Sequence, residues 1–349
     1  MQNVLELGHK KNAAVGNHGA TCATPQNNIQ IGNLLRPHVV APKDYDNNKK
    51  SLFWRFFLTT HTPTYNIKDM FQCIKNLFQQ SVCIRIQAGL GNTMFQYATA
   101  YAYAKKHNKR LLLYDHPEEL VSTFNINNKI ISTPPKRHIF DENKGANHFR
   151  DFVNTDNFKF LNGYFQDGQV FEEYSDDLLN IFRFKKPLTG ANAYFAHQIQ
   201  NTNSVSIHVR RTDYLLEFPN SVLPPEYYLS AIEYIASRIK NPHFYIFSDQ
   251  LRWVEANIKI KYPHTYITSN RSWQTAPHDM HLMSLCKHNI IANSSFSWWG
   301  AWLNTNPNKL IIAPSTWIID SAQHINTTKY IVPDSWIRIP SGINVDSVS

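Results

Sequence analysis

Two adjacent arginines follow a short apolar run in the second half of the chain. Residues 204–209 (SVSIHV) have the composition of a β-strand, and Arg210 and Arg211 come directly after it. A guanidinium group offers a planar fork of N–H donors that suits diphosphate oxygens, and it stays charged at any working pH. Two such charges are costly to bury without an anionic partner, and Asp213 could be that partner for one of them. The pattern predicts either a diphosphate site or a solvated surface cluster.

A second polar cluster follows another apolar run. Residues 289–292 (NIIA) are typical of a buried parallel strand, and Asn293, Ser294 and Ser295 separate it from a predicted helix over 296–303. In an open α/β sheet, ligands bind at the carboxyl ends of strands, where helix N-termini offer free backbone N–H groups to anions. The two serines could hold a phosphate there. An ordinary capped helix with buried tryptophans is the alternative.

The first half of the chain carries a strand, a glycine turn and a helix. Residues 82–86 form a predicted strand, the turn 89–91 (GLG) follows, and a helix is expected over 92–106. Residues 111–114 form a second predicted strand, so the segment has the pattern of a βαβ unit. A G-x-G turn alone is a weak sign of nucleotide binding.

Four short motifs follow one another along the chain: 89–98 (GLGNTMFQYA), 163–166 (GYFQ), 208–213 (HVRRTD) and 293–303 (NSSFSWWGAWL). Together they resemble glycosyltransferase family 11, the α-1,2-fucosyltransferases that use GDP-fucose. The resemblance extends over residues 82–314, most of the chain. Ala88 and Thr93 stand where the family usually has glycine and glutamine, at the end of the site where the acceptor is expected.

The resemblance implies a site for the donor diphosphate. Arg210 would stabilise the leaving group, because the β-phosphate gains charge as the C–O bond breaks and a fixed guanidinium then stabilises the transition state more than the ground state. Arg211 belongs to the same donor-binding motif. Ser294, Ser295 and Phe296 would hold the other phosphate oxygens through Ser295 and the backbone amides. No metal ion is then required.

The same resemblance implies a site for the guanine base. Guanine needs an acceptor for its N1–H and N2 amino protons, and Asp279 lies sixteen residues before Ser295, the interval found in related α-1,6 enzymes. A helix N-cap is the alternative for Asp279. His208 could cover the base, and is otherwise a buried core histidine.

Four polar residues are candidates for acceptor binding and proton transfer. Asn92 and Gln96 would contact the acceptor sugar from the wall of the cleft. Asp213 is expected to pin the arginines rather than act as a base. Glu217, four residues further on, is the nearest free carboxylate that could take the proton of the acceptor hydroxyl.

Strands that alternate with helices predict an α/β fold with a parallel sheet. The resemblance implies a GT-B-like architecture, in which two Rossmann-like α/β domains face a cleft. We expect an acceptor-side domain over 81–195 and a GDP-fucose-binding domain over 196–349, divided near the polar stretch 191–203. Residues 1–80 are expected to be an N-terminal extension, partly disordered or packed on the core. Helical spacing predicts core packing for at least two of three tryptophans, Trp298, Trp299 and Trp302.

Composition and charge limit the classes of partner that the protein is expected to bind. The 349 residues carry a net charge of +9, with five of these charges in residues 1–80, but no nucleic-acid-binding motif is present. The aromatic and basic residues of 49–58 make a candidate peripheral membrane contact. The triplet 44–46 (DYD) matches the DxD pattern of metal-dependent transferases, but it lies outside any recognisable core. The cysteine spacing indicates neither a zinc site nor a disulfide framework, so we expect a cytoplasmic protein, with peripheral binding at the inner membrane face as an option.

The leading hypothesis is an inverting, metal-independent enzyme that transfers fucose from GDP-fucose to the 2-hydroxyl group of a terminal galactose on a glycan. A GDP-sugar transferase of different linkage is the first alternative, because the arginine motif also resembles that of α-1,6-fucosyltransferases. A non-catalytic glycan-binding or nucleotide-sugar-binding module is the second. A binding module has no need for a leaving-group arginine. No cofactor besides the donor substrate is expected.

Overall fold

The computed structural model describes residues 80–142, 151–270, 272, 274–317 and 328–342. The expected N-terminal extension up to residue 79, with the DxD-like triplet and the candidate membrane contact at 49–58, lies outside the described residues.

The first half of the described chain forms a parallel sheet. Its strands are β1 (Ser81–Ile86), β2 (Arg110–Asp115), β3 (Lys129–Ile131), β4 (Ile139–Asp141) and β5 (Phe160–Asn162). Their spatial order is β3-β2-β1-β5-β4, and every pairing is parallel. Four of the six residues of the central strand β1 are apolar and buried, as expected of a parallel strand that is covered on both faces.

The second half forms another parallel sheet. Its strands are β6 (Asn203–Val209), β7 (Pro242–Ser248), β8 (His264–Tyr266), β9 (His288–Ile290), β10 (Ile311–Pro314) and β11 (Ile337–Ile339). The spatial order is β11-β10-β9-β6-β7-β8, again with parallel pairings throughout. Two Rossmann-like parallel sheets confirm the predicted GT-B-like α/β fold class. Both sheets lie in a single unit of the chain.

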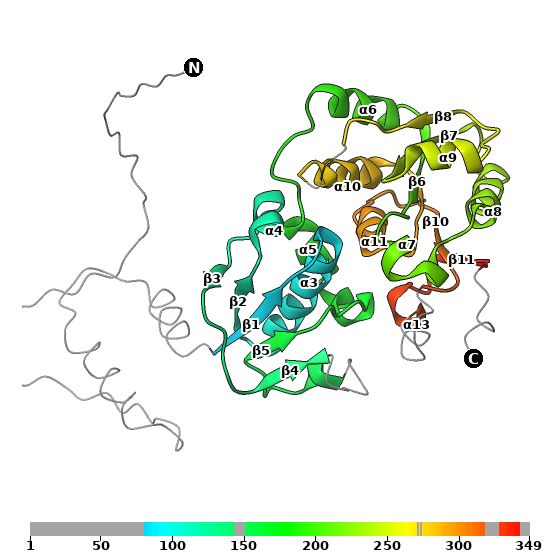
Figure 1. The fold of residues 1–349 in the computed structure, drawn as a ribbon. Coiled ribbons are helices and arrows are strands. Elements are labelled where there is room, and N and C mark those ends of the chain that lie inside the picture. Colours follow the sequence, from blue (N-terminus) through cyan, green and yellow to red (C-terminus); the bar gives the residue numbers. More distant parts are fainter. Residues whose placement is uncertain (1–79, 143–150, 271, 273, 318–327, 343–349) are drawn as a thin grey trace, which may run out of the picture. The chain divides into compact units, whose positions relative to one another are not determined.

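Helices lie between all consecutive strands except β3 and β4, and parallel neighbours require such crossover connections (Figure 1). The α-helices are α3 (Leu90–Lys106), α4 (Glu118–Thr123), α5 (Ser175–Ile181), α6 (Gly190–Gln200), α7 (Tyr214–Glu217), α8 (Pro225–Ala236), α9 (Leu251–Asn257), α10 (Ala276–Leu285), α11 (Ser295–Trp302) and α13 (Thr328–Ile331). Short 3₁₀ helices cover Asp151–Asn154, Gly168–Tyr174 and Pro219–Ser221. Within the described ranges, no helix is both long and apolar enough to cross a membrane.

Helix α6 occupies the stretch that we expected to be a boundary between the halves. The predicted division at residues 195/196 falls inside this helix. Asparagine is a weak helix former, but tertiary contacts override propensity here. Ile199 is fully buried, and the Asn192 amide donates to Oδ1 of Asn270 at 3.0 Å. Helix α6 packs on α10 and β6, and therefore belongs with the second sheet.

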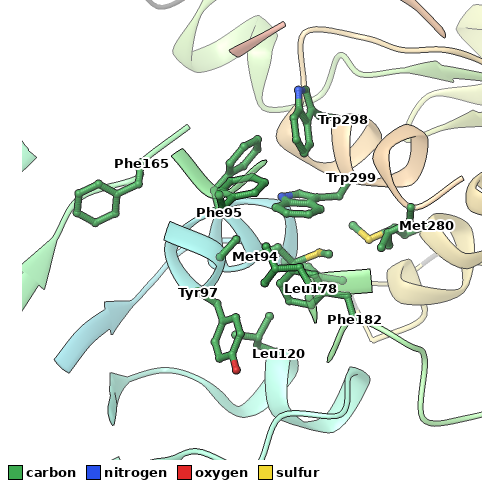
Figure 2. Packing of buried hydrophobic residues seen from close by; sticks show 14 of the residues in the cluster. Met94, Phe95, Tyr97, Leu120, Phe165, Leu178, Phe182, Met280, Trp298 and Trp299 are labelled. Carbon is green, nitrogen blue, oxygen red and sulfur yellow. The ribbon is translucent and has the colours of Figure 1, made fainter. Parts of the chain in front are cut away.

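A core of aromatic side chains joins α3 and α11. The ring centroid of Phe95 on α3 lies 4.6 Å from that of Trp298 and 5.1 Å from that of Trp299 on α11 (Figure 2). Phe171 stacks on Trp299 at 5.5 Å. Trp298 and Trp299 are fully buried, and the indole N–H of Trp298 donates to the carbonyl oxygen of Ile331 at 2.6 Å. The prediction of core packing for two of the three tryptophans is confirmed.

The N-terminal turns of α3 and α11 meet backbone on backbone. A Cβ atom added at Gly91 would lie 2.5 Å from the backbone nitrogen of Phe296 and 2.5 Å from the carbonyl carbon of Ser295. No side chain fits in that space, and neither obstacle is a flexible group that could move aside. A glycine at position 91 is therefore required for the two helices to approach this closely.

We expect Gly91→Ala to lower the free energy of unfolding by about 1–3 kcal/mol, the usual effect of overpacking. Helix propensity alone would instead stabilise α3 by about 0.5–1 kcal/mol. The sign of the change in unfolding free energy therefore distinguishes overpacking from propensity. Gly89→Ala is the matched control, because nothing lies within 4 Å of a Cβ added there and its φ is −71°. Urea denaturation measures both changes. A Gly91→Ala protein as stable as the control variant would show that the helices do not meet in this way.

Candidate active site

Both sheets reverse their strand order beside their central strands. The chain runs from β6 through β7 to β8, and then returns to β9 on the other side of β6. In the first sheet, β2 and β3 lie on one side of β1 and β5 lies on the other. The carboxyl ends of strands at such a switch point are the usual ligand site of an open α/β sheet. Arg210 follows β6, Ser294 follows β9, Asn92 follows β1 and Gln166 follows β5.

A bidentate ion pair fixes Arg210 at the end of β6. Its Nε and Nη2 donate to the two carboxylate oxygens of Asp213 at 2.8 and 2.9 Å, and Nε lies 3.5 Å from Asp249. Burial would lower the pKa of Arg210, but the two carboxylates outweigh it and raise this pKa above its usual value. Burial would likewise raise the pKa of Asp213, and the guanidinium outweighs it and lowers this pKa. Two of the five guanidinium N–H groups bind Asp213, so three remain for an anion.

Asp249, at the carboxyl end of β7, fixes the backbone of the same turn. Its carboxylate accepts from the backbone N–H groups of Arg211 at 3.1 Å and Thr212 at 3.0 Å. The guanidinium carbon of Arg211 lies 3.5 Å from the ring centroid of Trp253 on α9, a cation–π contact. Asp213 therefore pins Arg210 as predicted, whereas Arg211 is held by Asp249 and Trp253. Neither Asp249 nor Trp253 was assigned a role from the sequence.

The N-terminus of α11 lies beside the end of β6, because β9 and β6 are paired. Ser294 occupies the N-cap position but makes no side-chain capping bond, so the first N–H groups of α11 have no side-chain acceptor from their own cap. The hydroxyl group of Tyr214 on α7 donates to the carbonyl oxygen of Asn293. This bond joins the turn that carries Arg210 to the segment that leads into α11.

His208 is the second-last residue of β6, and its ring is neutral. The side chain is 5% exposed, and burial, together with the charge of Arg210, lowers its pKa to about 3 although Asp213 opposes the shift. Its Nδ1 atom has no hydrogen-bond partner among the described residues. The ring centroid lies 5.7 Å from that of Phe296 on α11. Within the described residues, the ring therefore lacks a hydrogen bond that a buried core histidine usually makes at Nδ1.

Hydrogen bonds join the switch points of the two sheets. Oδ1 of Asn92 accepts from the hydroxyl group of Ser295 at 2.8 Å and from the amide of Gln166 at 2.7 Å. Gln96 does not lie in the wall of the acceptor site, where the sequence analysis placed it. It is fully buried, and its amide accepts from the backbone N–H of Gln87 at 2.9 Å and donates to the carbonyl oxygen of Gln87 at 3.2 Å. Gln96 shapes the β1–α3 turn, so its amide is not available to a sugar.

Glu142, directly after β4, fixes the loop after β5. Its Oε2 accepts from the backbone N–H groups of Tyr164 at 2.6 Å and Phe165 at 3.0 Å. Burial raises the pKa of Glu142 above its usual value, although both hydrogen bonds oppose the shift. Each sheet thus has a carboxylate, Asp249 or Glu142, that holds the loop of the neighbouring switch-point strand. Glu142 could not be recognised from the sequence because β4 is only three residues long.

Asp279 lies in the first turn of α10, in a separate network. Thr275 is the N-cap residue of that helix, so Asp279 is not its cap. Its Oδ1 accepts from the amide of Asn270 at 2.6 Å. Asn270 and Asn192 of α6 exchange two amide hydrogen bonds of 3.0 Å each. Helix α6 therefore holds the loop that positions Asp279.

Glu217 is exposed at the end of α7, four residues after Asp213. Its carboxylate makes no hydrogen bond or ion pair within the part of the chain that the structure describes. Both oxygens of Asp213, by contrast, are bound to Arg210. Of these two acidic residues, only Glu217 is available to accept a proton from a bound hydroxyl group.

Comparison with known proteins gives consistent matches. The family model described as glycosyl transferase family 11 matches residues 55–339. The O-antigen biosynthesis glycosyltransferase WbnK of Escherichia coli is 30% identical over 304 residues, which cover 73% of this chain and 99% of that protein. An α-1,2-colitosyltransferase of Escherichia coli is 30% identical over 289 residues, 74% of this chain and 98% of the relative. The galactoside 2-α-L-fucosyltransferase SEC1 of Bos taurus is 25% identical, with 63% of each chain covered.

We expect Glu142→Gln to change how stability depends on pH. Glutamine keeps an acceptor oxygen for the loop but carries no charge. Because the folded pKa of Glu142 is raised, its stabilising contribution is fully present below the ordinary pKa of 4.5 and is lost as the pH rises through the folded value. The unfolding free energy of wild type minus that of the variant should therefore fall from acidic to neutral pH. Urea denaturation across this range measures it.

The control for this experiment is Glu226→Gln, which removes an exposed carboxylate from the first turn of α8. A difference between wild type and Glu142→Gln that stays constant, or grows as the pH rises, would contradict the burial of the Glu142 carboxylate.

Proposed function

The chain belongs to glycosyl transferase family 11, and we propose that it is an inverting, metal-independent α-1,2-fucosyltransferase. Membership of the family makes the chain a glycosyltransferase. In our proposal, fucose passes from GDP-fucose to the 2-hydroxyl group of a terminal galactose on a glycan. The similarity to a galactoside 2-α-L-fucosyltransferase supports this sugar, linkage and acceptor.

The observation that carries the proposal is the fixed cation at the β6–β9 switch point. Arg210 is oriented by both oxygens of Asp213 and keeps three N–H groups for a ligand. Its side chain is 36% exposed, so a bound anion can reach it. The N-terminus of α11 follows the neighbouring strand and adds backbone N–H groups and the positive end of a helix dipole. This is the arrangement that a departing diphosphate requires.

In the transfer step, one bond forms, one bond breaks and one proton is transferred. The acceptor oxygen forms a bond to the anomeric carbon of fucose from the face opposite the diphosphate, and the bond from that carbon to the β-phosphate oxygen breaks. The electron pair of the broken bond stays on the phosphate, where Arg210 and the amides of α11 stabilise it. The proton of the acceptor hydroxyl passes to Glu217, whose exposed carboxylate is not paired within the described residues.

Further residues bind the two substrates in this proposal. Asp279, oriented by Asn270, accepts the N1–H and N2 amino protons of guanine. His208 lies beneath the nucleotide with its neutral ring. Asn92 contacts the acceptor through its amide nitrogen, because its oxygen already accepts from Ser295 and Gln166.

A second candidate function differs in the sugar alone. The α-1,2-colitosyltransferase relative is 30% identical, more than the 25% of the galactoside fucosyltransferase. That observation favours transfer of colitose in the same α-1,2 linkage. The residues that hold the diphosphate and guanine would act in the same way with either sugar.

The function is tested by incubating the protein, in the presence of EDTA, with GDP-fucose or the corresponding colitose donor and a panel of β-galactosides. We expect transfer from GDP-fucose, and NMR of the product should show the new linkage at the galactose 2-position. Transfer from the colitose donor alone would select the second candidate. Activity that is lost in EDTA and restored by Mg²⁺ or Mn²⁺ would overturn the metal-independent mechanism.

Arg210→Ala should lower kcat by at least about 10²-fold, the size typical of removing one group that stabilises transition-state charge. Arg210→Lys should recover little of this loss, because an ammonium group cannot reproduce the bidentate fork on Asp213. Steady-state kinetics with GDP-fucose measures both variants, and Arg238→Ala, which removes an exposed arginine just after α8, is the control. Near-wild-type turnover of Arg210→Ala would remove this residue from the mechanism.

Asp279→Asn should weaken GDP binding by about 30-fold or more. It replaces an acceptor oxygen by an N–H donor that faces the guanine donors, a loss on the order of 2–4 kcal/mol. Calorimetric titration of GDP gives the dissociation constant. Asp176→Asn, which neutralises an exposed first-turn carboxylate of α5, controls for the change of charge at a helix N-terminus. If Asp279→Asn binds GDP as wild type does, Asp279 is not the guanine acceptor.

A further inference from the structure

The loop after β5 carries an exposed aromatic side chain, Tyr164, at the switch point of the first sheet. Tyr164 is 41% exposed, whereas its neighbour Phe165 is fully buried. The loop continues the strand that pairs with β1, so Tyr164 lies at the carboxyl edge of the sheet next to the β1–α3 turn. Few large apolar side chains are exposed among the described residues, and Tyr164 is the one that lies at this edge.

The backbone on both sides of Tyr164 is held rigidly. Oε2 of Glu142 binds the N–H groups of Tyr164 and Phe165. Gly163 packs directly on Glu142, because a Cβ added there would lie 2.5 Å from the Glu142 Cβ and 2.6 Å from its Oε2. Gln166 anchors the other end of the loop by donating to Asn92 at 2.7 Å. Tyr164 is therefore exposed on a fixed backbone and not at a loose loop tip.

Phe165 adopts a backbone conformation that its type disfavours. Its φ is +55°, in the left-handed region that side chains with a Cβ rarely adopt. Such strain persists only where surrounding contacts impose it, and it clusters at ligand-binding positions. Here the buried Phe165 ring and the Glu142 carboxylate impose it. The turn that results separates the side chains of consecutive residues, with Phe165 buried and Tyr164 at the surface.

The loop is connected to the donor side of the site through Asn92. Gln166 and Ser295 bind the same oxygen of Asn92, so the loop after β5 and the N-terminus of α11 share one anchor. Of the three tryptophans of α11, Trp298 and Trp299 are fully buried, and Trp302 is partly buried and packed against both. An acceptor whose hydroxyl group approaches the donor at α11 therefore meets Tyr164 as the exposed aromatic ring of the first sheet's edge.

We propose that Tyr164 is the surface on which the galactose ring of the acceptor lies, an inference that rests on the function proposed above. A pyranose ring has one face of C–H groups, and the electron-rich face of an aromatic ring attracts them. The phenol hydroxyl group gives the same side chain a polar end for a neighbouring sugar hydroxyl. Tyr164 thus determines the affinity and orientation of the acceptor, and it does not contact the reacting atoms.

The test is the dissociation constant of lactose, measured by saturation-transfer NMR in the presence of saturating GDP. Tyr164→Ala should weaken lactose binding about tenfold or more, which corresponds to about 1.4 kcal/mol. Tyr164→Phe keeps the ring face, so it should stay within about threefold of wild type. Tyr194→Ala, which removes an even more exposed tyrosine from α6, is the matched control and should change nothing. Unfolding midpoints and GDP affinity should be the same in all four proteins.

The acceptor KM should follow the same order, with kcat and the KM for GDP-fucose changed by less than about twofold. Lactose affinity that is equal in wild type and Tyr164→Ala, or absent from wild type, would overturn the inference. A wild-type protein that binds lactose through Tyr164 but transfers no fucose would instead refute the proposed function and leave the sugar surface in place.

Discussion

The close approach of two helix N-termini constrains the rest of the molecule. Gly91 of α3 lies against the backbone of Ser295 and Phe296 at the start of α11, with no room for a Cβ. Each helix N-terminus carries about half a positive charge, so placing two together is unfavourable in the absence of a negative group. The oxygen of Asn92, which accepts from Ser295, offsets part of that field. An anionic ligand would offset more, and the fold therefore favours a phosphate at this place before any charged side chain is counted.

Carboxylates of neighbouring strands hold the functional loops of both sheets. Asp249 binds two backbone N–H groups of the turn that carries Arg210, and Glu142 binds two in the loop that carries Tyr164. In each case the acid comes from the strand beside the switch-point strand. Backbone N–H groups in irregular loops need acceptors, and a carboxylate satisfies two at once. The loops are thereby pre-organised, which lets their side chains act without first becoming ordered.

The sequence predicted the parts of the site that depend on local pattern. Arg210 and Ser295 follow apolar strands, and their order along the chain was sufficient to place both at one sheet edge. The same reasoning could not find Glu142, because β4 is too short to be recognised and its pairing with β5 is not local. It also misplaced Gln96, whose partner is the backbone of Gln87 in a turn that only the fold defines. Helix α6 was missed because its stability comes from contacts with α10 and β6 rather than from its asparagine-rich sequence.

The central claim is that Arg210 and the N-terminus of α11 stabilise negative charge on the β-phosphate. A ³¹P NMR titration of GDP bound to the protein measures this directly, as the pKa at which the terminal phosphate loses its second proton. Free phosphomonoesters have a second pKa of about 6. A fixed guanidinium and a helix N-terminus favour the dianion, so the bound phosphate should titrate well below the value of free GDP, and the Arg210→Ala variant should reverse much of that shift. A bound pKa equal to or above that of free GDP would contradict the account.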